Sequence, residues 1–208
     1  MRIGIVGLGL IGGSLAKALK AYTGHEVLVS NRTAATAQAA VEAGDADGLL
    51  TDEALSGAEI VFVCLYPGAT VAYVREKAAL FAKGALVVDC SGVKTPVCEP
   101  LFPVARAHGF VFVGGHPMAG KETSGYAAAE AGLFRGASMI LVPDVDSGLG
   151  KLSRLCTELG FGRVVVTTAA LHDRTIAYTS QLAHIVSSAY VKSETARSES
   201  GFSAGSFR

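Results

Sequence analysis

The sequence predicts a doubly wound α/β domain followed by the start of an all-helical region. Short, continuously apolar segments alternate with segments of helical composition from the first residues to about residue 168. Strands that are apolar along their whole length are typical of a parallel sheet covered on both faces. Right-handed crossovers between such strands place helices on both sides of the sheet, which gives the doubly wound arrangement.

The expected strands are short runs rich in β-branched and other large apolar residues. They cover residues 2–6, 26–30, 59–65, 85–89, 110–113, 139–142 and 163–167. Helical composition separates them, and Pro67 fits a first helical turn because that position needs no N–H donor. The expected helices cover residues 11–21, 34–43, 69–81, 95–107, 122–134 and 149–159. The pattern leaves open whether the last strands run parallel or antiparallel.

A different pattern begins after Thr168. Residues 169–200 contain neither Gly nor Pro, and apolar residues recur there at helical spacing. These residues are Tyr178, Leu182, Ile185, Val186, Ala189 and Tyr190. We therefore expect a long helix over about 170–195, and we divide the chain into a sheet domain, 1–168, and the start of a helical domain, 169–208. The apolar stripe must pack on the sheet domain, on a second copy, or on residues outside this sequence.

The composition excludes several classes of function. Lys plus Arg and Asp plus Glu each total 18, so the formal net charge is zero. A nucleic-acid-binding protein needs a basic face, and so does a polybasic membrane contact; we expect neither partner. No apolar run is long enough to span a bilayer and no targeting segment is visible, which favours a cytoplasmic location. The four scattered cysteines fit reduced core thiols and lack the spacing of metal ligands.

A glycine-rich segment lies between the first strand and the first helix and fits the pattern G-x-G-x-x-G. Gly7 permits a tight turn, Gly9 allows the backbone to approach a pyrophosphate, and Gly12 lets helix and strand pack closely. The free N–H groups and the dipole at the helix N-terminus then favour the anion. This context predicts a Rossmann domain that binds a nicotinamide dinucleotide. The residues expected to bind it are Gly7, Leu8, Gly9, Leu10, Ile11 and Gly12.

The end of the second strand bears on which dinucleotide is bound. NAD enzymes usually carry Asp or Glu there to hold the ribose hydroxyls. This chain has Ser30, Asn31 and Arg32 instead. A hydroxyl, an amide and a guanidinium suit a 2′-phosphate better than a bare ribose, so we favour NADP over NAD. The alternative is that Arg32 is a solvated surface charge and that NAD binds adequately.

Three further segments follow strands, at the edge where α/β sheets bind ligands: residues 64–67, 89–94 and 114–120. Leu65 and Tyr66 are expected beside a ribose of the cofactor. His116 lies between glycines and a proline just beyond a buried strand. A lone histidine is more often structural, but this position across from the glycine loop favours a function. A neutral imidazole there can accept a proton from a substrate hydroxyl while hydride leaves the same carbon.

At these motifs the sequence resembles the prephenate and arogenate dehydrogenases of tyrosine biosynthesis. The resemblance rests on the glycine loop, on Gly-Val-Lys at 92–94, and on Gly-Gly-His-Pro-Met-Ala-Gly at 114–120. The last of these motifs is much more specific than the glycine loop. The resemblance continues through residues 121–125, 172–173 and 179–184, so it covers essentially the whole chain.

This resemblance implies an oxidative decarboxylation. Hydride passes from the ring carbon that bears the hydroxyl to the nicotinamide, the hydroxyl proton is taken up, and carbon dioxide leaves as the ring becomes aromatic. By the same resemblance His116 accepts the hydrogen bond or the proton at the ring hydroxyl. Lys94 is expected near the cofactor, Ser124 near the substrate, and His184 on a helix that faces the active site.

The chain departs from the family pattern in three places. Relatives carry a serine that supports the catalytic histidine where this chain has Gly92, and we expect Ser91 to substitute, with Cys90 or a water as alternatives. Many relatives have His at the position of Gln181, so a contact between Gln181 and the substrate would carry no charge. The family continues into a helical dimerisation domain with a substrate-binding arginine. We therefore expect a homodimer through the C-terminal helices, and a sequence truncated before that arginine.

Two alternatives remain on the sequence alone. β-Hydroxyacid-type dehydrogenases share the glycine loop and a helical second domain, but use a lysine on that domain's helix, for which Lys192 is the only candidate. The other alternative is a non-catalytic fragment that only binds the dinucleotide. The sequence does not distinguish prephenate from arogenate as the small-molecule substrate.

Overall fold

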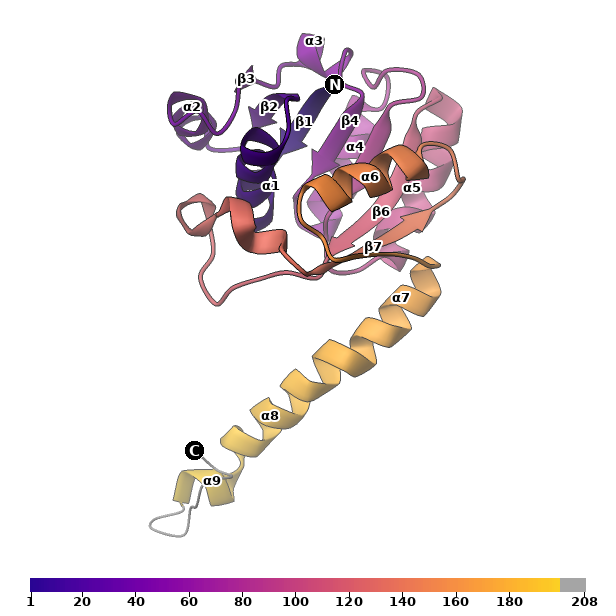
Figure 1. Ribbon diagram of the computed structural model, residues 1–208. Coiled ribbons are helices and arrows are strands. Elements are labelled where there is room, and N and C mark those ends of the chain that lie inside the picture. The colour runs from indigo at the N-terminus through magenta and orange to yellow at the C-terminus, as the bar shows by residue number, and fades with distance from the viewer. Residues whose placement is uncertain (199–208) are drawn as a thin grey trace. The chain divides into compact units, whose positions relative to one another are not determined.

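The computed structural model describes residues 1–198, apart from the side chains of residues 183, 196 and 197. The chain divides into two compact units, Met1–Ala169 and Ala170–Arg208. The division lies one residue beyond the boundary expected from the sequence. The first unit contains the sheet and the second is helical in the part that the structure describes (Figure 1).

Within the described residues, eight strands form a single sheet in the order β3-β2-β1-β4-β5-β6-β7-β8. They are β1 (Arg2–Val6), β2 (Glu26–Ser30), β3 (Gly48–Leu49), β4 (Ile60–Val63), β5 (Leu86–Asp89), β6 (Val111–Pro117), β7 (Ser138–Pro143) and β8 (Arg163–Val166). All neighbouring strands are parallel except β6 and β7, which are antiparallel. The orientation that the sequence left open is therefore antiparallel for β7 against β6, with β8 parallel to β7.

Helices cover both faces of the sheet because successive strand residues point to opposite faces. In β4, Ile60 and Phe62 join one buried cluster, and Val61 and Val63 join the other. The first cluster is completed by α1 (Leu10–Tyr22), α2 (Ala34–Glu42) and α6 (Leu149–Glu158), and Figure 1 shows α1 and α6 on the face toward the viewer. The second is completed by α3 (Asp52–Leu55), α4 (Pro67–Lys77) and α5 (Thr95–His108). The doubly wound fold class is confirmed.

The segment between β6 and β7 differs from the expectation of a helix over 122–134. The structure forms two short 3₁₀ helices instead, Tyr126–Ala128 and Ala131–Phe134. Gly125 precedes them with φ +86°, a conformation that interrupts a helix. Phe134 stacks on Phe161 with ring centroids 4.8 Å apart, so burial of this ring sets the local path. Tertiary packing therefore overrides the helical composition of this segment.

Two short elements were not predicted. Strand β3 pairs with β2 at the edge of the sheet, and α3 follows it. Thr51 caps the start of α3, and its side chain accepts a hydrogen bond from the Ala54 N–H at 3.2 Å. Elements of two and four residues carry no periodic hydrophobic pattern, so only this capping residue marked them in the sequence.

The second unit is helical through most of its described length. Helix α7 spans Ala169–Ile176, a π-helical turn spans Ala177–Gln181, α8 spans Leu182–Lys192 and α9 spans Glu194–Ser198. The long helix expected over 170–195 is thus present with a π-helical turn inside it and an interruption at Ser193. Several large apolar side chains on it are exposed: Tyr178, Ile185, Val186, Tyr190 and Val191. None of the helices described within residues 1–198 is long and apolar enough to cross a membrane.

Candidate active site

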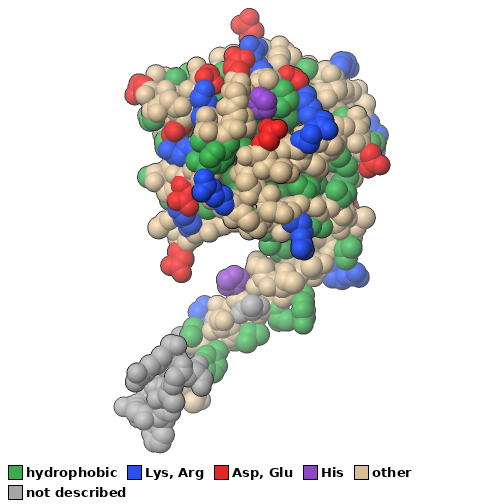
Figure 2. Space-filling view, viewed as in Figure 1, with side chains coloured by type: hydrophobic (Ala, Val, Ile, Leu, Met, Phe, Trp, Pro, Cys, Tyr) green, Lys and Arg blue, Asp and Glu red, His purple; other side chains and the backbone are tan. Residues whose placement is uncertain are grey.

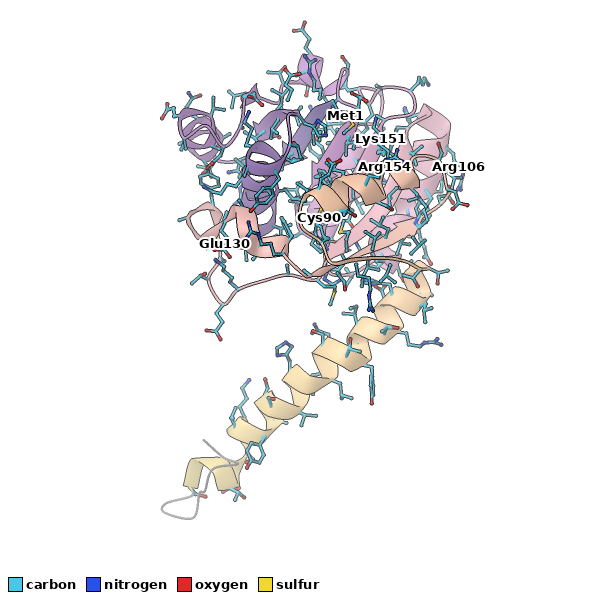
Figure 3. The ribbon with its side chains drawn as sticks, in the orientation of Figure 1. Met1, Cys90, Arg106, Glu130, Lys151 and Arg154 are labelled. Atoms are coloured by element: carbon cyan, nitrogen blue, oxygen red, sulfur yellow. The ribbon has the colours of Figure 1, made fainter. Side chains whose placement is uncertain are left out.

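A pocket of about 730 Å³ opens at the carboxyl edge of the parallel strands. Its volume is in the range of about 300–1,000 Å³ that suits small-molecule ligands. The residues that line it come from the segments after β1, β2, β4, β5 and β6: Gly7, Leu8, Gly9, Leu10, Ile11, Gly12, Asn31, Arg32, Thr33, Cys64, Leu65, Tyr66, Pro67, Ala69, Cys90, Ser91, Gly92, Ser124 and Gly125. Figure 3 labels Cys90, which directly follows β5 at this edge. The topology therefore brings together segments that are distant in sequence, such as those of Gly7 and Gly125, which are 118 residues apart.

The glycine loop has the shape that a dinucleotide phosphate requires. Gly7 adopts φ +90°, and its N–H donates to the Ser30 carbonyl at 2.8 Å. A Cβ on Gly12 would lie 1.9 Å from the Gly7 carbonyl oxygen, so only glycine allows α1 to start this close to β1. A Cβ on Gly9 would meet no atom within 4 Å, which leaves open space in front of the α1 N-terminus. No side chain caps this helix end, so its first N–H groups are available to an anion.

The segment after β2 is tied to the glycine loop. The Leu8 N–H donates to Asn31 Oδ1 at 2.9 Å, and Asn31 Nδ2 donates to the Thr33 carbonyl at 3.2 Å. Asn31 therefore holds the loop, while the exposed Arg32 lines the pocket. Ser30 ends β2 and holds the loop through its carbonyl, but it does not line the pocket. None of the described residues that line this pocket is acidic.

The segment after β4 forms a further wall of the pocket. Leu65 and Tyr66 line it, and Tyr66 is 87% exposed. Their place beside a ribose of the cofactor stays a prediction. The sequence analysis named Cys90 as an alternative support for His116 and Cys64 only as a member of its segment, and both line the pocket. The hydrogen bond with Cys64, together with burial, raises the pKa of the Cys90 thiol well above its ordinary value of 9.0. Cys90 is therefore a neutral thiol at physiological pH.

His116 lies on β6, which extends through this residue to Pro117 rather than ending near residue 113 as expected. Its half-buried imidazole lies beside Gly92, where an added Cβ would be 3.8 Å from His116 Nε2. Gly92 lines the pocket, although His116 itself does not. The imidazole is thus at the margin of the same cavity that contains the glycine loop.

The turn after β5 is ordered by a buried carboxylate. The Ser91 N–H donates to Asp89 Oδ1 at 2.9 Å, and the Ser91 hydroxyl lies 3.2 Å from Asp89 Oδ2 and 3.1 Å from the Val93 carbonyl oxygen. Burial raises the pKa of Asp89, and the nearby Lys94 ammonium opposes that shift. The hydroxyl of Ser91, expected to support the histidine, therefore contacts Asp89 and Val93.

The Lys94 side chain lies in the protein interior. It is fully buried, and its ammonium pairs with Asp89 and donates to the Gly115 carbonyl at 2.5 Å. It does not line the pocket, because the buried Asp89 carboxylate needs a cation beside it. Its expected place near the cofactor stays a prediction.

Ser124 lines the pocket, and the segment that carries it is fastened to α1. The Tyr126 hydroxyl donates to Asp45, which also accepts from Lys17 at 2.6 Å. The Glu130 N–H donates to the Ser14 hydroxyl at 3.0 Å. These contacts hold the β6–β7 connection next to the helix whose N-terminus faces the pocket.

The other expected substrate residues lie in the second unit. Gln181 ends the π-helical turn and His184 lies in α8, and both side chains are exposed. Their contact with a substrate stays a prediction. Among the described residues, no group of three or more His, Cys, Asp or Glu side chains could hold a metal ion.

Comparison with known proteins places the chain in a family. The family model for the prephenate dehydrogenase nucleotide-binding domain matches residues 15–166. The chain belongs to the prephenate dehydrogenase family. It is 31% identical to the cyclohexadienyl dehydrogenase of Zymomonas mobilis, over 99% of this chain and 73% of that protein. It is also 31% identical to the prephenate dehydrogenase of Bacillus subtilis, over 98% of this chain and 58% of that protein.

Solved structures of this family have the same fold. The arogenate dehydrogenase of Synechocystis superposes with a TM-score of 0.86 at 30% identity, covering 100% of this chain and 77% of that one. Prephenate dehydrogenase from Aquifex aeolicus, in complex with hydroxyphenyl propionate and NAD+, gives 0.76 at 27% identity, covering 92% and 68%. The family resemblance is thereby confirmed. As a member of the prephenate dehydrogenase family, the chain is an NAD(P)-dependent oxidoreductase.

Proposed function

We propose that this prephenate dehydrogenase family member oxidatively decarboxylates a cyclohexadienyl acid, prephenate or arogenate, in tyrosine biosynthesis. The observation that carries the proposal is one continuous pocket, with the glycine loop on one wall and Gly92, beside the His116 imidazole, on another. The arrangement suits a dinucleotide whose diphosphate lies at the α1 N-terminus. When bound, an oxidised nicotinamide supplies the acceptor for the substrate's hydride.

In this proposal the chain's own residues position the reactants and move one proton. His116 accepts the proton of the ring hydroxyl as hydride leaves the carbon that bears it. The C–C bond to the carboxylate then breaks and carbon dioxide leaves, while the electron pair of that bond moves into the ring and gives an aromatic phenolate. His116 then returns the proton to the phenolate oxygen. The proposed substrate contacts are Ser124 and, from the second unit, Gln181 and His184. Ser91 is proposed to act through the turn that carries Gly92, since its hydroxyl contacts Asp89.

The experiment that tests this function is substrate-dependent reduction of NADP and of NAD by the protein with each acid. We expect turnover with at least one acid, and we expect His116→Asn to lower kcat by about 10²–10⁴-fold, the usual contribution of general acid–base catalysis. Dinucleotide affinity should be unchanged in this variant, because His116 does not line the pocket. Wild-type turnover in His116→Asn would remove the histidine from the mechanism.

We propose that NADP is preferred to NAD. The support is the exposed Arg32 just after β2, in a pocket where no described lining residue has a carboxylate to hold ribose hydroxyls. Arg32→Ala should weaken NADP binding by about 5- to 100-fold, as for loss of a charge-assisted hydrogen bond, and leave NAD binding nearly unchanged. Equal losses for both dinucleotides, measured by fluorescence titration, would contradict the preference.

We further propose that the protein forms a homodimer through its C-terminal helices and works in the cytoplasm. The support for the dimer is the row of exposed apolar side chains Tyr178, Ile185, Val186 and Tyr190. Light scattering of the wild type and of Ile185→Glu tests it, with a dimer expected for the first and a monomer for the second. A monomeric wild type would contradict the dimer.

A further inference from the structure

The Asp89–Lys94 ion pair is the part of the site that the proposed reaction does not use directly. Asp89 ends β5 and Lys94 immediately precedes α5, and neither side chain has any exposed surface. Removing one partner of a buried pair is strongly destabilising, yet such a pair is weak evidence for net stability because desolvation opposes the attraction. A role other than stability therefore has to be sought in what the pair contacts.

The Lys94 ammonium reaches β6 at the residue before His116. It donates to the Gly115 carbonyl at 2.5 Å, in addition to its pairing with Asp89. The Gly115 carbonyl and the His116 N–H belong to the same planar peptide group. The contact with Lys94 therefore fixes the orientation of that group and of the backbone that carries the imidazole. The lysine thus acts on the strand that carries the imidazole and not on the pocket.

The two glycines before His116 leave room for this contact, because a side chain at either position would collide with its neighbours. A Cβ on Gly114 would lie 3.1 Å from Lys94 Cδ, and 2.4 Å from Cys98 Sγ. A Cβ on Gly115 would lie 2.4 Å from the Asp89 carbonyl oxygen. The Gly-Gly pair therefore lets β6 pack against the lysine side chain and against the end of β5.

Asp89 is connected to the turn beside the imidazole and, through Lys94, to the strand that carries it. Through Ser91, whose N–H donates to Asp89 Oδ1 at 2.9 Å, it orders the turn that places Gly92 beside His116. Through Lys94 it orders β6 at Gly115. One buried carboxylate thus sets the position of the histidine and of the backbone that faces it.

We propose that Asp89 and Lys94 are positioning residues for His116. They hold the β6 backbone and the 91–92 turn in register, so that the imidazole stays at the margin of the pocket. The proposal rests on the proposed role of His116 as proton acceptor. A displacement of about 1 Å at a reacting group can cost about 100-fold in rate, so a contact of this kind can matter without touching the substrate.

The test uses the full chain with the double variant Asp89→Asn/Lys94→Met, which removes both charges together and leaves neither one buried alone. We expect kcat to fall about 10- to 100-fold, with the dissociation constant of the dinucleotide changed by less than about twofold. The matched control is Glu59→Gln/Lys151→Met, which removes an exposed Lys–carboxylate pair of 2.6 Å and should change neither quantity. Circular dichroism and thermal unfolding establish that each variant folds.

A second readout follows His116 directly by NMR of protein labelled with ¹⁵N-histidine, the His116→Asn variant assigning its signal. We expect the His116 ring signals to shift or broaden in the double variant, while those of His25 and His108 stay in place. Asp89→Asn alone keeps an acceptor for the Ser91 N–H but leaves the buried Lys94 ammonium without its carboxylate, so it should change the His116 signals at least as much as the double variant does.

Three results would overturn the proposal: unchanged kcat and unchanged His116 signals, a loss confined to dinucleotide affinity, or failure of both variants to fold. The second would return Lys94 to direct cofactor binding, and the third would assign the pair to folding alone. If the wild type turns over neither acid, the proposed function fails, and the NMR measurement still decides whether the pair positions His116.

Discussion

Gly92 leaves open space beside the His116 imidazole. A Cβ there would lie 3.8 Å from Nε2 and would clash with nothing nearer, and the φ of Gly92 lies outside the left-handed region. A serine could therefore be accommodated at this position, where the family pattern has one. Ser91 does not fill the space, because its hydroxyl contacts Asp89 and the Val93 carbonyl.

We expect Gly92→Ser to raise kcat about two- to tenfold, because a hydrogen bond to the imidazole is worth about 0.5–1.5 kcal/mol. The measurement is the steady-state rate at saturating dinucleotide with whichever acid is the substrate. Gly92→Ala is the control, since it adds the Cβ without the hydroxyl. A serine variant no faster than the alanine variant would show that His116 gains nothing from a hydroxyl at this position.

Membership of the candidate site could be predicted for residues that a local sequence pattern marks. The glycines of the loop and His116 follow strands directly, and parallel strands present their carboxyl ends at one edge. The burial of Lys94 could not be predicted in the same way. It depends on Asp89 and on the Gly115 carbonyl, and sequence spacing alone does not show that these three groups meet.

At the scale of elements, the junction of β1 and α1 determines where the dinucleotide can bind. Gly7 and Gly12 are required by the packing of the chain itself, because a Cβ on either would lie within 2.6 Å of a backbone oxygen. Gly9 is different, since nothing lies within 4 Å of its added Cβ. The absence of a side chain at Gly9 is therefore explained by the approach of a ligand and not by packing within the fold.

We expect Gly9→Ala to fold with an unchanged melting temperature and to weaken dinucleotide binding by about tenfold or more, which corresponds to about 1.4 kcal/mol. The added methyl group would occupy the space in which the pyrophosphate approaches the backbone. Calorimetric unfolding and fluorescence titration measure the two quantities. Gly150→Ala in α6, where an added Cβ also meets nothing within 4 Å, should alter neither. Wild-type affinity in Gly9→Ala would place the diphosphate elsewhere.

The elements that the sequence predicted are the continuously apolar strands and the longer helices between them. The apolar strands and the helix α6 needed no information beyond their own residues. The composition of segment 122–134 predicts a helix, but the stacking of Phe134 on Phe161 and the positive φ of Gly125 give it another path. Such contacts join residues distant in sequence, so local propensity does not reveal them.

At the scale of the whole molecule, charges of both signs are interspersed on the face that Figure 2 shows. This distribution agrees with the zero formal net charge and offers no broad basic surface on that face. The stability of the first unit comes instead from two apolar clusters, one on each face of the sheet. Cys156 on α6 belongs to the first of them.

Burial raises the pKa of the Cys156 thiol from its ordinary value of 9.0 to about 12. The folded state therefore retains this proton where the unfolded state has lost it, and the stabilisation is present below pH 9 and lost as the pH rises toward 12. Over this range the free energy of unfolding should fall by up to about 1.4 kcal/mol for each pH unit on account of this group. Denaturant unfolding of the wild type and of Cys156→Ala between these pH values measures it. A slope as steep in the variant as in the wild type would contradict the assignment.

The most direct test of the central claim is a crystal structure of the protein grown with NADP. We expect the bridging phosphates to accept hydrogen bonds from the main-chain amides that open α1, and the nicotinamide to extend toward Gly92 and the neighbouring imidazole. Phosphates bound away from the glycine loop, or a nicotinamide on the opposite side of the pocket from His116, would contradict the account.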